Sequence, residues 1–337
     1  MIEINKNSKV LIAPLNWGLG HASRCIPIIN HFIKEKCDII IASDGEASLL
    51  LRKEFPNLIH EDLPSYDISY PNTKNIIWHL ASMSKKIIGN VDKENTFLKE
   101  LNQKHNFDII ISDNRPGVYL KNVYSIYITH QTNIQAKSFS SIANKVHNYY
   151  MKRFDEIWIP DFEGENSLAG DLSIYKGQIK HKYIGPISRF AASNNYPEPN
   201  RLLFILSGPE PQRSILEELI LMNISDLTEE VILVRGVVEK QHSVKRRHNL
   251  TIYNYLTSED LENEIAIASL VVCRSGYSSI MDLHKMAKKA FFIPTPGQTE
   301  QEYLAKYLKD KGIANYIRQN NLNLSKILDS SLAYSGF

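Results

Sequence analysis

The stretch "KVLIAPLNWGLGHASRC" (residues 9–25) decides the fold. Its first half is a short apolar run without polar alternation, which is typical of a strand buried on both faces of a parallel sheet. Its second half holds two glycines, a histidine and an arginine, and an amphipathic segment (22–35) follows. A glycine-containing turn between a buried strand and a helix opens many nucleotide-binding folds. We therefore expect an α/β domain that begins at this turn.

The same pattern continues along the chain and then restarts. Amphipathic segments separate most of the further apolar runs, and a Pro-, Asn- and Ser-rich stretch (185–200) divides them into two groups. The runs are 38–43, 108–112, 125–129 and 156–160 before that stretch, and 201–208, 230–236, 249–255, 269–276 and 290–297 after it. The sequence predicts two Rossmann-like α/β domains facing a cleft: an N-terminal domain (1–186), a linker (187–200) and a C-terminal domain (201–337).

The composition is that of an ordinary globular protein. Of 337 residues, 43% are hydrophobic and 23% are charged, and the net charge of +2 gives no indication of nucleic-acid binding. Three cysteines without metal-ligand spacing are interpreted as reduced thiols. The N-terminus lacks the pattern of a signal peptide, and no apolar run approaches the length of a membrane span. We expect a cytoplasmic protein.

Contact with a membrane surface stays open. Two lysines and three aromatic residues could favour a lipid surface, although an ordinary solvated face is the favoured interpretation; they are Lys85, Lys86, Tyr66, Tyr70 and Trp78. An irregular stretch (61–75) in the same half of the chain is long enough to indicate a functional loop.

The glycine turn itself indicates anion binding. Gly18 and Gly20 allow main-chain N–H groups to approach a ligand, and a helix starting near His21 would direct its positive end toward it. His21 can act as a base. Arg24 stands near the third-glycine position of a dinucleotide fingerprint, which argues against a nicotinamide enzyme. The structural alternative is that His21 only caps or packs the helix start.

Three further segments place polar residues after buried strands. In "VVCRSGYSSIMDL" (271–283) a helix opening at Ser275 would present N–H groups to an anion, and Asp282 could accept hydrogen bonds from a ribose diol. The amides and carboxylates of "PTPGQTEQEYLAKYL" (294–308) suit a polyhydroxylated ligand. "YITHQTNIQ" (127–135) and "ISDNRPG" (111–117) end neighbouring strands with His130 and Asp113. The alternatives are that Asp282 is an ordinary exposed helix residue, that residues 294–308 form a capped surface helix, and that His130 is a structural histidine.

Together these segments resemble a known family. "GLGH", "THQTN", "VVCRSGYSSIMD" and "PTPGQTEQEY" occur in the order and approximate spacing of GT-B glycosyltransferases, and are similar to family 28, which includes the UDP-N-acetylglucosamine transferase of peptidoglycan synthesis. The resemblance implies a GT-B fold in which the C-terminal domain binds a UDP-sugar and the N-terminal domain binds the acceptor. Glu302 departs from the pair of glutamines that the family uses for the sugar, so the donor sugar stays open.

The resemblance also implies a set of site residues. His21 matches the histidine between acceptor and donor, and is the expected catalytic base. The expected donor-side residues are Ser207, Gly208, Arg213, Leu261, Arg274, Ser275, Gly276, Tyr277, Ser278, Asp282, Gln301 and Glu302. On the acceptor side, His130 and Asn133 match the family's histidine and asparagine. With the turn and strand-end residues described above, the expected acceptor-side residues are Gly18, Gly20, Arg24, Asp113, His130 and Asn133.

The expected activity is an inverting transfer of a sugar, N-acetylglucosamine being one candidate, from a UDP-sugar to an acceptor hydroxyl. Helix amides would meet the diphosphate, and neither a metal nor another cofactor is expected because no Asp-x-Asp pair or metal-ligand cluster is present. The acceptor stays open among small molecules, glycans and lipid-linked compounds. "GLGHASRC" is also similar to the turn of a related UDP-sugar hydrolase, so a hydrolase or an epimerase of this fold is the first alternative. A nucleotide-sugar-binding protein without turnover is the second.

Overall fold

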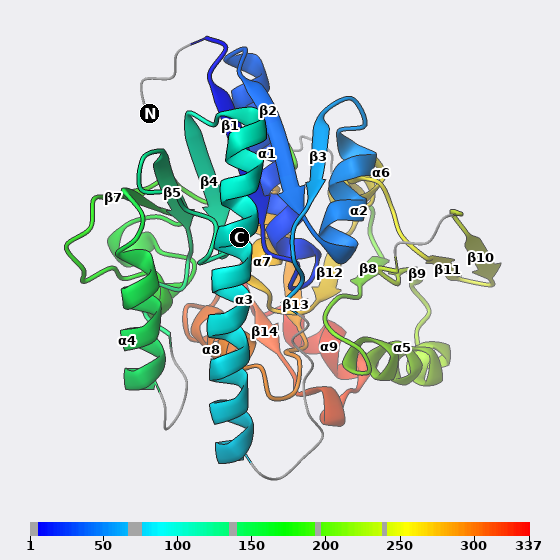
Figure 1. Ribbon diagram of the computed structural model, residues 1–337. Coiled ribbons are helices and arrows are strands. Elements are labelled where there is room, and N and C mark those ends of the chain that lie inside the picture. The colour runs from blue at the N-terminus through cyan, green and yellow to red at the C-terminus, as the bar shows by residue number, and fades with distance from the viewer. Residues whose placement is uncertain (1–5, 67–75, 135–139, 193–196, 238–240) are drawn as a thin grey trace. The chain divides into compact units, whose positions relative to one another are not determined.

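The computed structural model describes residues 6–66, 76–134, 140–192, 197–237 and 241–337, without the side chains of residues 76–88, Ser140 and Asp226. By its internal contacts the chain divides into two units. Unit 1 comprises Met1–His130, Ser141–Pro160 and Tyr175–Tyr183, and unit 2 comprises Gln131–Ser140, Asp161–Ile174 and Ile184–Phe337. Each unit holds one parallel-dominated α/β sheet (Figure 1). The α/β class predicted from the sequence is confirmed; the cleft and the domain boundaries stay predictions.

The sheet of unit 1 is parallel throughout, in the order β3-β2-β1-β4-β5-β6-β7. Its strands are β1 (Lys9–Pro14), β2 (Asp38–Ser43), β3 (Ile59–Asp62), β4 (Ile109–Asp113), β5 (Tyr124–Ile128), β6 (Glu156–Ile159) and β7 (His181–Tyr183). Its helices are α1 (Leu19–Lys34), α2 (Gly45–Glu54), α3 (Ile76–His105) and α4 (Ser140–Met151). The strand order reverses between β1 and β4, where open α/β sheets bind their ligands.

Apolar strands buried on both faces explain why this sheet forms. The runs "KVLIAP" and "DIIIAS" are almost entirely buried. Leu98 and Leu101 of α3 pack against Leu11 of β1 and Ile110 of β4, as the course of α3 across these strands shows (Figure 1). The irregular stretch predicted at 61–75 begins with the last two residues of β3, and residues 67–75 lie outside the described residues.

The sheet of unit 2 has the order β10-β11-β9-β8-β12-β13-β14, and only β10 runs antiparallel to its neighbour. Its strands are β8 (Arg201–Ile205), β9 (Glu230–Val234), β10 (Val244–Arg247), β11 (Leu250–Tyr253), β12 (Leu270–Cys273), β13 (Ala290–Phe292) and β14 (Asn315–Tyr316). Its helices are α5 (Gln212–Asn223), α6 (Ser258–Ile267), α7 (Tyr277–Lys285), α8 (Thr299–Asp310) and α9 (Leu324–Ser331). Short 3₁₀ turns lie at Gly164–Asn166, Gly170–Leu172, Ile224–Asp226 and Gln319–Asn321.

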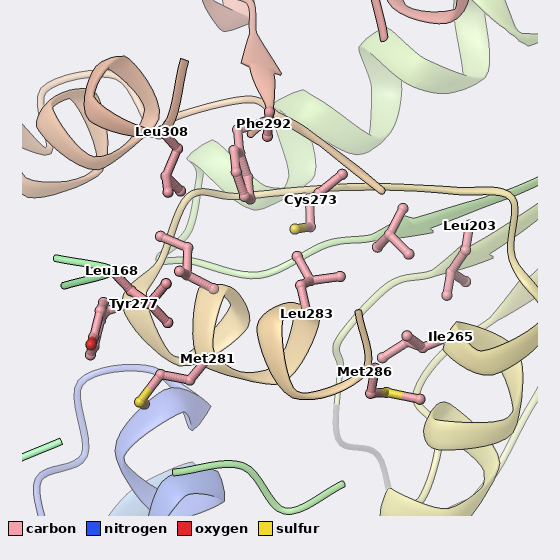
Figure 2. Packing of buried hydrophobic residues seen from close by; sticks show 14 of the residues in the cluster. Leu168, Leu203, Ile265, Cys273, Tyr277, Met281, Leu283, Met286, Phe292 and Leu308 are labelled. Carbon is pink, nitrogen blue, oxygen red and sulfur yellow. The ribbon is translucent and has the colours of Figure 1, made fainter. Parts of the chain in front are cut away.

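The core of unit 2 includes a segment from the first half of the sequence. Leu168 and Leu172 are buried in the cluster that α7 and α8 form with the sheet. Figure 2 shows this core, with Leu283 of α7 facing Cys273 of β12 and Leu168 near Tyr277. Residues 161–174, which the sequence places in the N-terminal domain, therefore contribute to the core of unit 2. In the described part of the chain, no helix is long and apolar enough to cross a membrane.

Candidate functional site

The first polar cluster lies where β1 runs into α1. Gly18 adopts a positive φ of 76° as the N-cap of α1, a conformation that favours glycine, and an added Cβ would meet nothing within 4 Å. The helix begins at Leu19, slightly before the predicted start, so Gly20 and His21 both stand in its first turn. This turn places the His21 side chain at the carboxyl end of β1.

Asp113, the last residue of β4, holds the His21 ring. The Asp113 carboxylate is fully buried, and its Oδ1 lies 3.0 Å from His21 Nδ1, whereas the His21 side chain is 14% exposed. An ionised carboxylate only accepts hydrogen bonds, so a hydrogen bond from His21 to Asp113 requires the ring proton on Nδ1. The other nitrogen, Nε2, then keeps its lone pair and can accept a proton.

Arg24 shares the same carboxylate one helical turn after His21. Its Nε donates to Asp113 Oδ2 at 2.5 Å, and its Nη2 donates to Asp113 Oδ1. Its Nη1 lies 3.2 Å from Nδ1 of His130, which follows β5. The structure thus brings together four residues predicted from the sequence: His21, Arg24, Asp113 and His130. The Arg24 guanidinium is buried and engaged by Asp113, in an inward position that the sequence analysis did not anticipate.

Burial and charge set the protonation of this cluster. Burial alone would raise the pKa of Asp113, but the Arg24 guanidinium and His21 outweigh it and hold that pKa well below its usual range. Burial lowers the pKa of His21, Asp113 opposes this, and Arg24 lowers it again, so the pKa ends below the ordinary value. Burial, with Asp113, raises the pKa of the Cys25 thiol. At neutral pH the cluster therefore holds an ionised Asp113 and a neutral His21.

Asn133, expected on the acceptor side, belongs to unit 2. Its backbone N–H donates to the Leu172 carbonyl at 3.0 Å, and its Nδ2 donates to the Asp171 carbonyl at 3.3 Å. These contacts fix Asn133 to the segment 161–174.

The second polar cluster lies at the carboxyl edge of the unit 2 sheet. The neighbouring strands β8, β12 and β13 end there, so the loops that follow them lie near one another. Ser207 and Gly208, both exposed, follow β8, and Gly208 has a φ of 101°. Gly276 is the N-cap of α7, with open space where a Cβ would stand. The amides of Tyr277 and Ser278 begin α7 at this edge and can bind an anion.

Several predicted donor-side residues hold this edge together. The Ser275 hydroxyl is buried and donates to the Gln301 carbonyl at 2.8 Å. Gln301 Oε1 accepts from the Thr295 N–H at 2.8 Å, and its Nε2 donates to Gln298 Oε1 at 2.6 Å. The neighbouring Glu302 is exposed. The Gln301 amide thus supports the loop after β13.

Two other predicted donor-side residues are buried in the core. The side chains of Tyr277 and Leu261 pack in the apolar core cluster of unit 2, and both are almost fully buried. Leu261 was expected on the donor side. In the structure its side chain is a core residue of α6.

The two arginines at this edge have different surroundings. Arg213 donates to Glu217 Oε2 at 2.9 Å and from Nε to Glu210 Oε1 at 2.6 Å, so its charge is balanced. Arg274 is 1% exposed, and its hydrogen-bond acceptors among the described residues are neutral oxygens of Ile293, Pro294, Gln212 and Gln319. Burial lowers the pKa of Arg274 to about 10, which leaves it charged at neutral pH. Arg274 therefore supplies buried positive charge beneath this edge.

The carboxyl group of Asp282 is a weaker acid than an ordinary aspartate side chain. Ser188 Oγ donates to Asp282 Oδ1 at 2.6 Å. Burial raises the pKa of Asp282 to about 6, against the opposing effects of Arg189 and of the Ser188 hydrogen bond. The sequence analysis missed Ser188 because it lies 94 residues away in the predicted linker region. It also missed Thr295, whose buried Oγ1 has no hydrogen-bond partner among the described residues.

Comparisons with known proteins identify a family for the second half of the chain. Residues 202–333 match the family model of the glycosyltransferase family 28 C-terminal domain. A UDP-N-acetylglucosamine–N-acetylmuramyl-(pentapeptide) pyrophosphoryl-undecaprenol N-acetylglucosamine transferase from Sulfurihydrogenibium sp. is 26% identical over 207 residues, which are 58% of this chain and 56% of that protein. The same enzyme from Pasteurella multocida is 32% identical over 28% of this chain and 27% of its own. The matched part of this chain thus spans about half of the first relative and about a quarter of the second.

Solved structures show the same fold. The crystal structure of MurG from Acinetobacter baumannii superimposes with a TM-score of 0.58 at 12% identity, over 98% of this chain and 91% of that one. The spinosyn rhamnosyltransferase SpnG gives a TM-score of 0.65 at 14% identity, over 98% and 93% of the two chains. In the described residues, no group of three or more His, Cys, Asp or Glu side chains is placed to hold a metal ion. Residues 202–333 are therefore a glycosyltransferase family 28 C-terminal domain, in a chain that has the GT-B fold and is a distant homologue of MurG transferases.

Proposed function

We propose that the protein is an inverting glycosyltransferase that moves a sugar from a UDP-sugar to an acceptor hydroxyl. The observation that carries the proposal is the family 28 match, because the polar loops after β8, β12 and β13 all fall within residues 202–333. The activity of the distant relatives, an N-acetylglucosamine transfer from UDP-N-acetylglucosamine according to their names, supports UDP-N-acetylglucosamine as the donor. Glu302, where the family has a glutamine, leaves room for another sugar.

The donor side follows from the carboxyl edge of unit 2. The amides that begin α7 at Tyr277 would meet the diphosphate, and the buried charge of Arg274 would favour its negative charge from below. The ionised Asp282 carboxylate would accept two hydrogen bonds from the ribose hydroxyls. Gln301 and Glu302 would stand on the sugar side. This arrangement stabilises the leaving UDP through backbone dipoles and an arginine.

We assign His21 as the base in the catalytic step. The acceptor oxygen attacks the anomeric carbon while the bond from that carbon to the UDP oxygen breaks, and UDP leaves with the electron pair. The transition state resembles an oxocarbenium ion, as in glycoside hydrolysis. The acceptor proton moves to His21 Nε2, because Asp113 holds Nδ1 in its protonated form.

A direct test replaces the base. A general base contributes about 10²–10⁴-fold, so His21→Ala should lower the rate of UDP release by that factor with UDP-sugar and acceptor present. His31→Ala, in the last turn of the same helix, is the matched control and should retain the wild-type rate. An unchanged rate in His21→Ala would assign that side chain a purely structural role.

The hydrolase alternative rests on His21 and Asp113 as well, since a base that activates a hydroxyl can also activate water. Incubation of the protein with UDP-sugar alone separates the two. Release of free sugar at the rate seen with an acceptor would identify a hydrolase, and a UDP-sugar with inverted ring stereochemistry would identify an epimerase. A thermal-shift screen should show stabilisation by UDP and its sugars but not by GDP, CMP or NAD, since only a bound ligand raises stability by mass action.

We further propose that unit 1 contacts an anionic lipid surface through α4. Ile142, Val146 and Tyr149 are 63%, 47% and 61% exposed and share one face of the helix. Lys145 and Lys152 accompany them, and residues 134–154 contain no acidic side chain, so the charge complements anionic headgroups. The side chains of Lys85, Lys86 and Trp78, and all of Tyr70, lie outside the described residues.

Vesicle sedimentation tests the lipid contact. Wild-type protein should sediment with phosphatidylglycerol vesicles, less so at high salt, and not with phosphatidylcholine vesicles. Ile142→Glu should abolish sedimentation, whereas Met222→Glu, at a 75% exposed apolar residue of unit 2, should not. Equal sedimentation of the Ile142→Glu variant would contradict the assignment.

A further inference from the structure

Arg24 occupies the centre of the unit 1 cluster without an obvious role in binding an acceptor. Its side chain is 2% exposed, and its guanidinium donates to both oxygens of the Asp113 carboxylate. The same Nη2 lies 2.9 Å from Nδ1 of His21, one helical turn earlier. When Nδ1 carries the proton donated to Asp113, both groups are donors, so this contact is a close approach of the cation to the ring and not a hydrogen bond. A cation therefore lies within hydrogen-bond distance of the proposed base and shares the anion that orients it.

A buried carboxylate raises the pKa of the histidine that it holds. An opposite charge at this distance favours the charged form of a group by about 1–3 pKa units. Asp113 therefore opposes the burial that lowers the pKa of His21, and alone it would increase the share of imidazolium, which has no lone pair to accept the acceptor's proton. The Arg24 guanidinium changes this balance, because it neutralises Asp113 and repels a second positive charge beside it.

We propose that Arg24 is a positioning residue, a role that rests on the proposed function. Arg24 shares the Asp113 carboxylate with His21, so the His21 ring stays uncharged and Nε2 remains its proton acceptor. Asp113 sets the orientation of the ring, and Arg24 cancels the charge that would otherwise protonate it. The two effects need both residues, because either one alone leaves a buried unpaired charge.

The other groups around the cluster leave this balance in place. From α1, Cys25 Sγ lies 3.6 Å from Asp113 Oδ2, and burial keeps it a thiol by raising its pKa. From β5, burial raises the pKa of Tyr127, and His130 Nδ1 accepts from Arg24 Nη1 because a guanidinium only donates. From α4, burial and His130 lower the pKa of His147 to about 4. Among the described residues, Asp113 and Arg24 are thus the charges that act most strongly on His21, and His130 adds a smaller effect that also lowers its pKa.

Histidine titration by NMR tests the proposal without any substrate. The full-length chain is labelled at the histidine ring carbons, and His21→Gln identifies the His21 signal. In the wild-type protein the His21 midpoint should lie below about 6.5, the value of an unperturbed histidine. A wild-type midpoint above 7 would overturn the proposal at once, whatever the variants do.

Three variants then separate charge from packing. Arg24→Gln should raise the His21 midpoint by about one pH unit or more, and Arg24→Lys, which keeps the charge, should return it most of the way. Asp113→Asn should lower the midpoint, because the guanidinium then acts unopposed. An unchanged or lower midpoint in folded Arg24→Gln protein would refute the role. If that variant does not fold, the Asp113→Asn and wild-type readings decide.

The pH profile of kcat/KM links the titration to the reaction. If His21 is the base, the acid limb of the profile should follow the NMR midpoint in each protein and move upward in Arg24→Gln. A midpoint that moves while the profile stays fixed would leave Arg24 coupled to His21 but would remove His21 from the mechanism. A His21 midpoint that does not change in Arg24→Gln would contradict the role of Arg24 and would leave the proposed sugar transfer unaffected.

Discussion

At the scale of a single residue, the proposed contact of Asp282 with the ribose should make nucleotide binding depend on pH. Its pKa of about 6 means that the carboxyl is mostly protonated at pH 5 and mostly ionised at pH 7.5. The ionised form accepts both ribose hydrogen bonds, so we expect the affinity for UDP to rise about tenfold across this range. Isothermal titration calorimetry at several pH values measures the change.

The terminal phosphate of UDP titrates in the same range, which requires a baseline. Asp282→Asn supplies it, because the amide keeps the shape of the side chain and loses its titration. The slope of affinity against pH should be clearly smaller in this variant than in the wild-type protein. Equal slopes would separate Asp282 from the ribose.

Arg115 shows how a buried charge network stabilises unit 1. Its guanidinium is fully buried and donates to Glu94 Oε1 at 2.5 Å and to Asp44 Oδ1 at 2.8 Å. Glu94→Gln removes one charged acceptor of Arg115 while Asp44 still balances the guanidinium, so it should lower the free energy of unfolding by about 1.5–3 kcal/mol in urea titrations. Arg52→Met, which breaks the exposed pair with Asp62, should change it by less than about 1 kcal/mol.

At the scale of elements, the sequence predicts the central strands and misses the edge ones. Runs such as "DIIIAS" and "DIIIS" identify β2 and β4 because isoleucine-rich segments of this length fit a sheet covered on both faces. The strands β7, β10 and β14 have the sequences "HKY", "VKRR" and "NY", which carry no such pattern. They pair because a neighbouring strand offers free backbone groups, which only the assembled sheet provides.

The turns between elements contain glycines that differ in a testable way. Gly236, after β9, has a φ of 70°, and an added Cβ would lie 2.3 Å from the Leu206 carbonyl oxygen. Gly312, after α8, has a φ of 72° with nothing within 4 Å. Gly312→Ala should cost about 1–2 kcal/mol from backbone strain alone. Gly236→Ala should cost about 1–3 kcal/mol more, because a backbone carbonyl cannot rotate aside. Equal costs in urea unfolding would show that the β9 turn relaxes freely.

At the scale of the whole molecule, one topological rule predicts much of the candidate site. Polar residues that follow parallel strands meet at the carboxyl edge of a sheet, and this brings His21 to Asp113 across 92 residues. The rule says which edge a residue occupies and nothing about its hydrogen-bond partners. The inward turn of Arg24, the burial of Leu261 and the Ser188–Asp282 bond depend on packing, which leaves no periodic signal in the sequence.

The segment 161–174 ties the first half of the sequence to the stability of unit 2. Leu172 is 1% exposed in the core of unit 2, and Tyr307 donates to the Ser167 carbonyl at 2.9 Å. Leu172→Ala should cost about 2–5 kcal/mol and should speed amide hydrogen exchange in β12, α7 and α8 while leaving β1 and β4 protected. Leu98→Ala, in the core of unit 1, is the matched control and should give the reverse pattern. Faster exchange in β1 and β4 alone after Leu172→Ala would mean that residues 161–174 stabilise the unit that precedes them in the sequence, and the division of the chain would then follow sequence order.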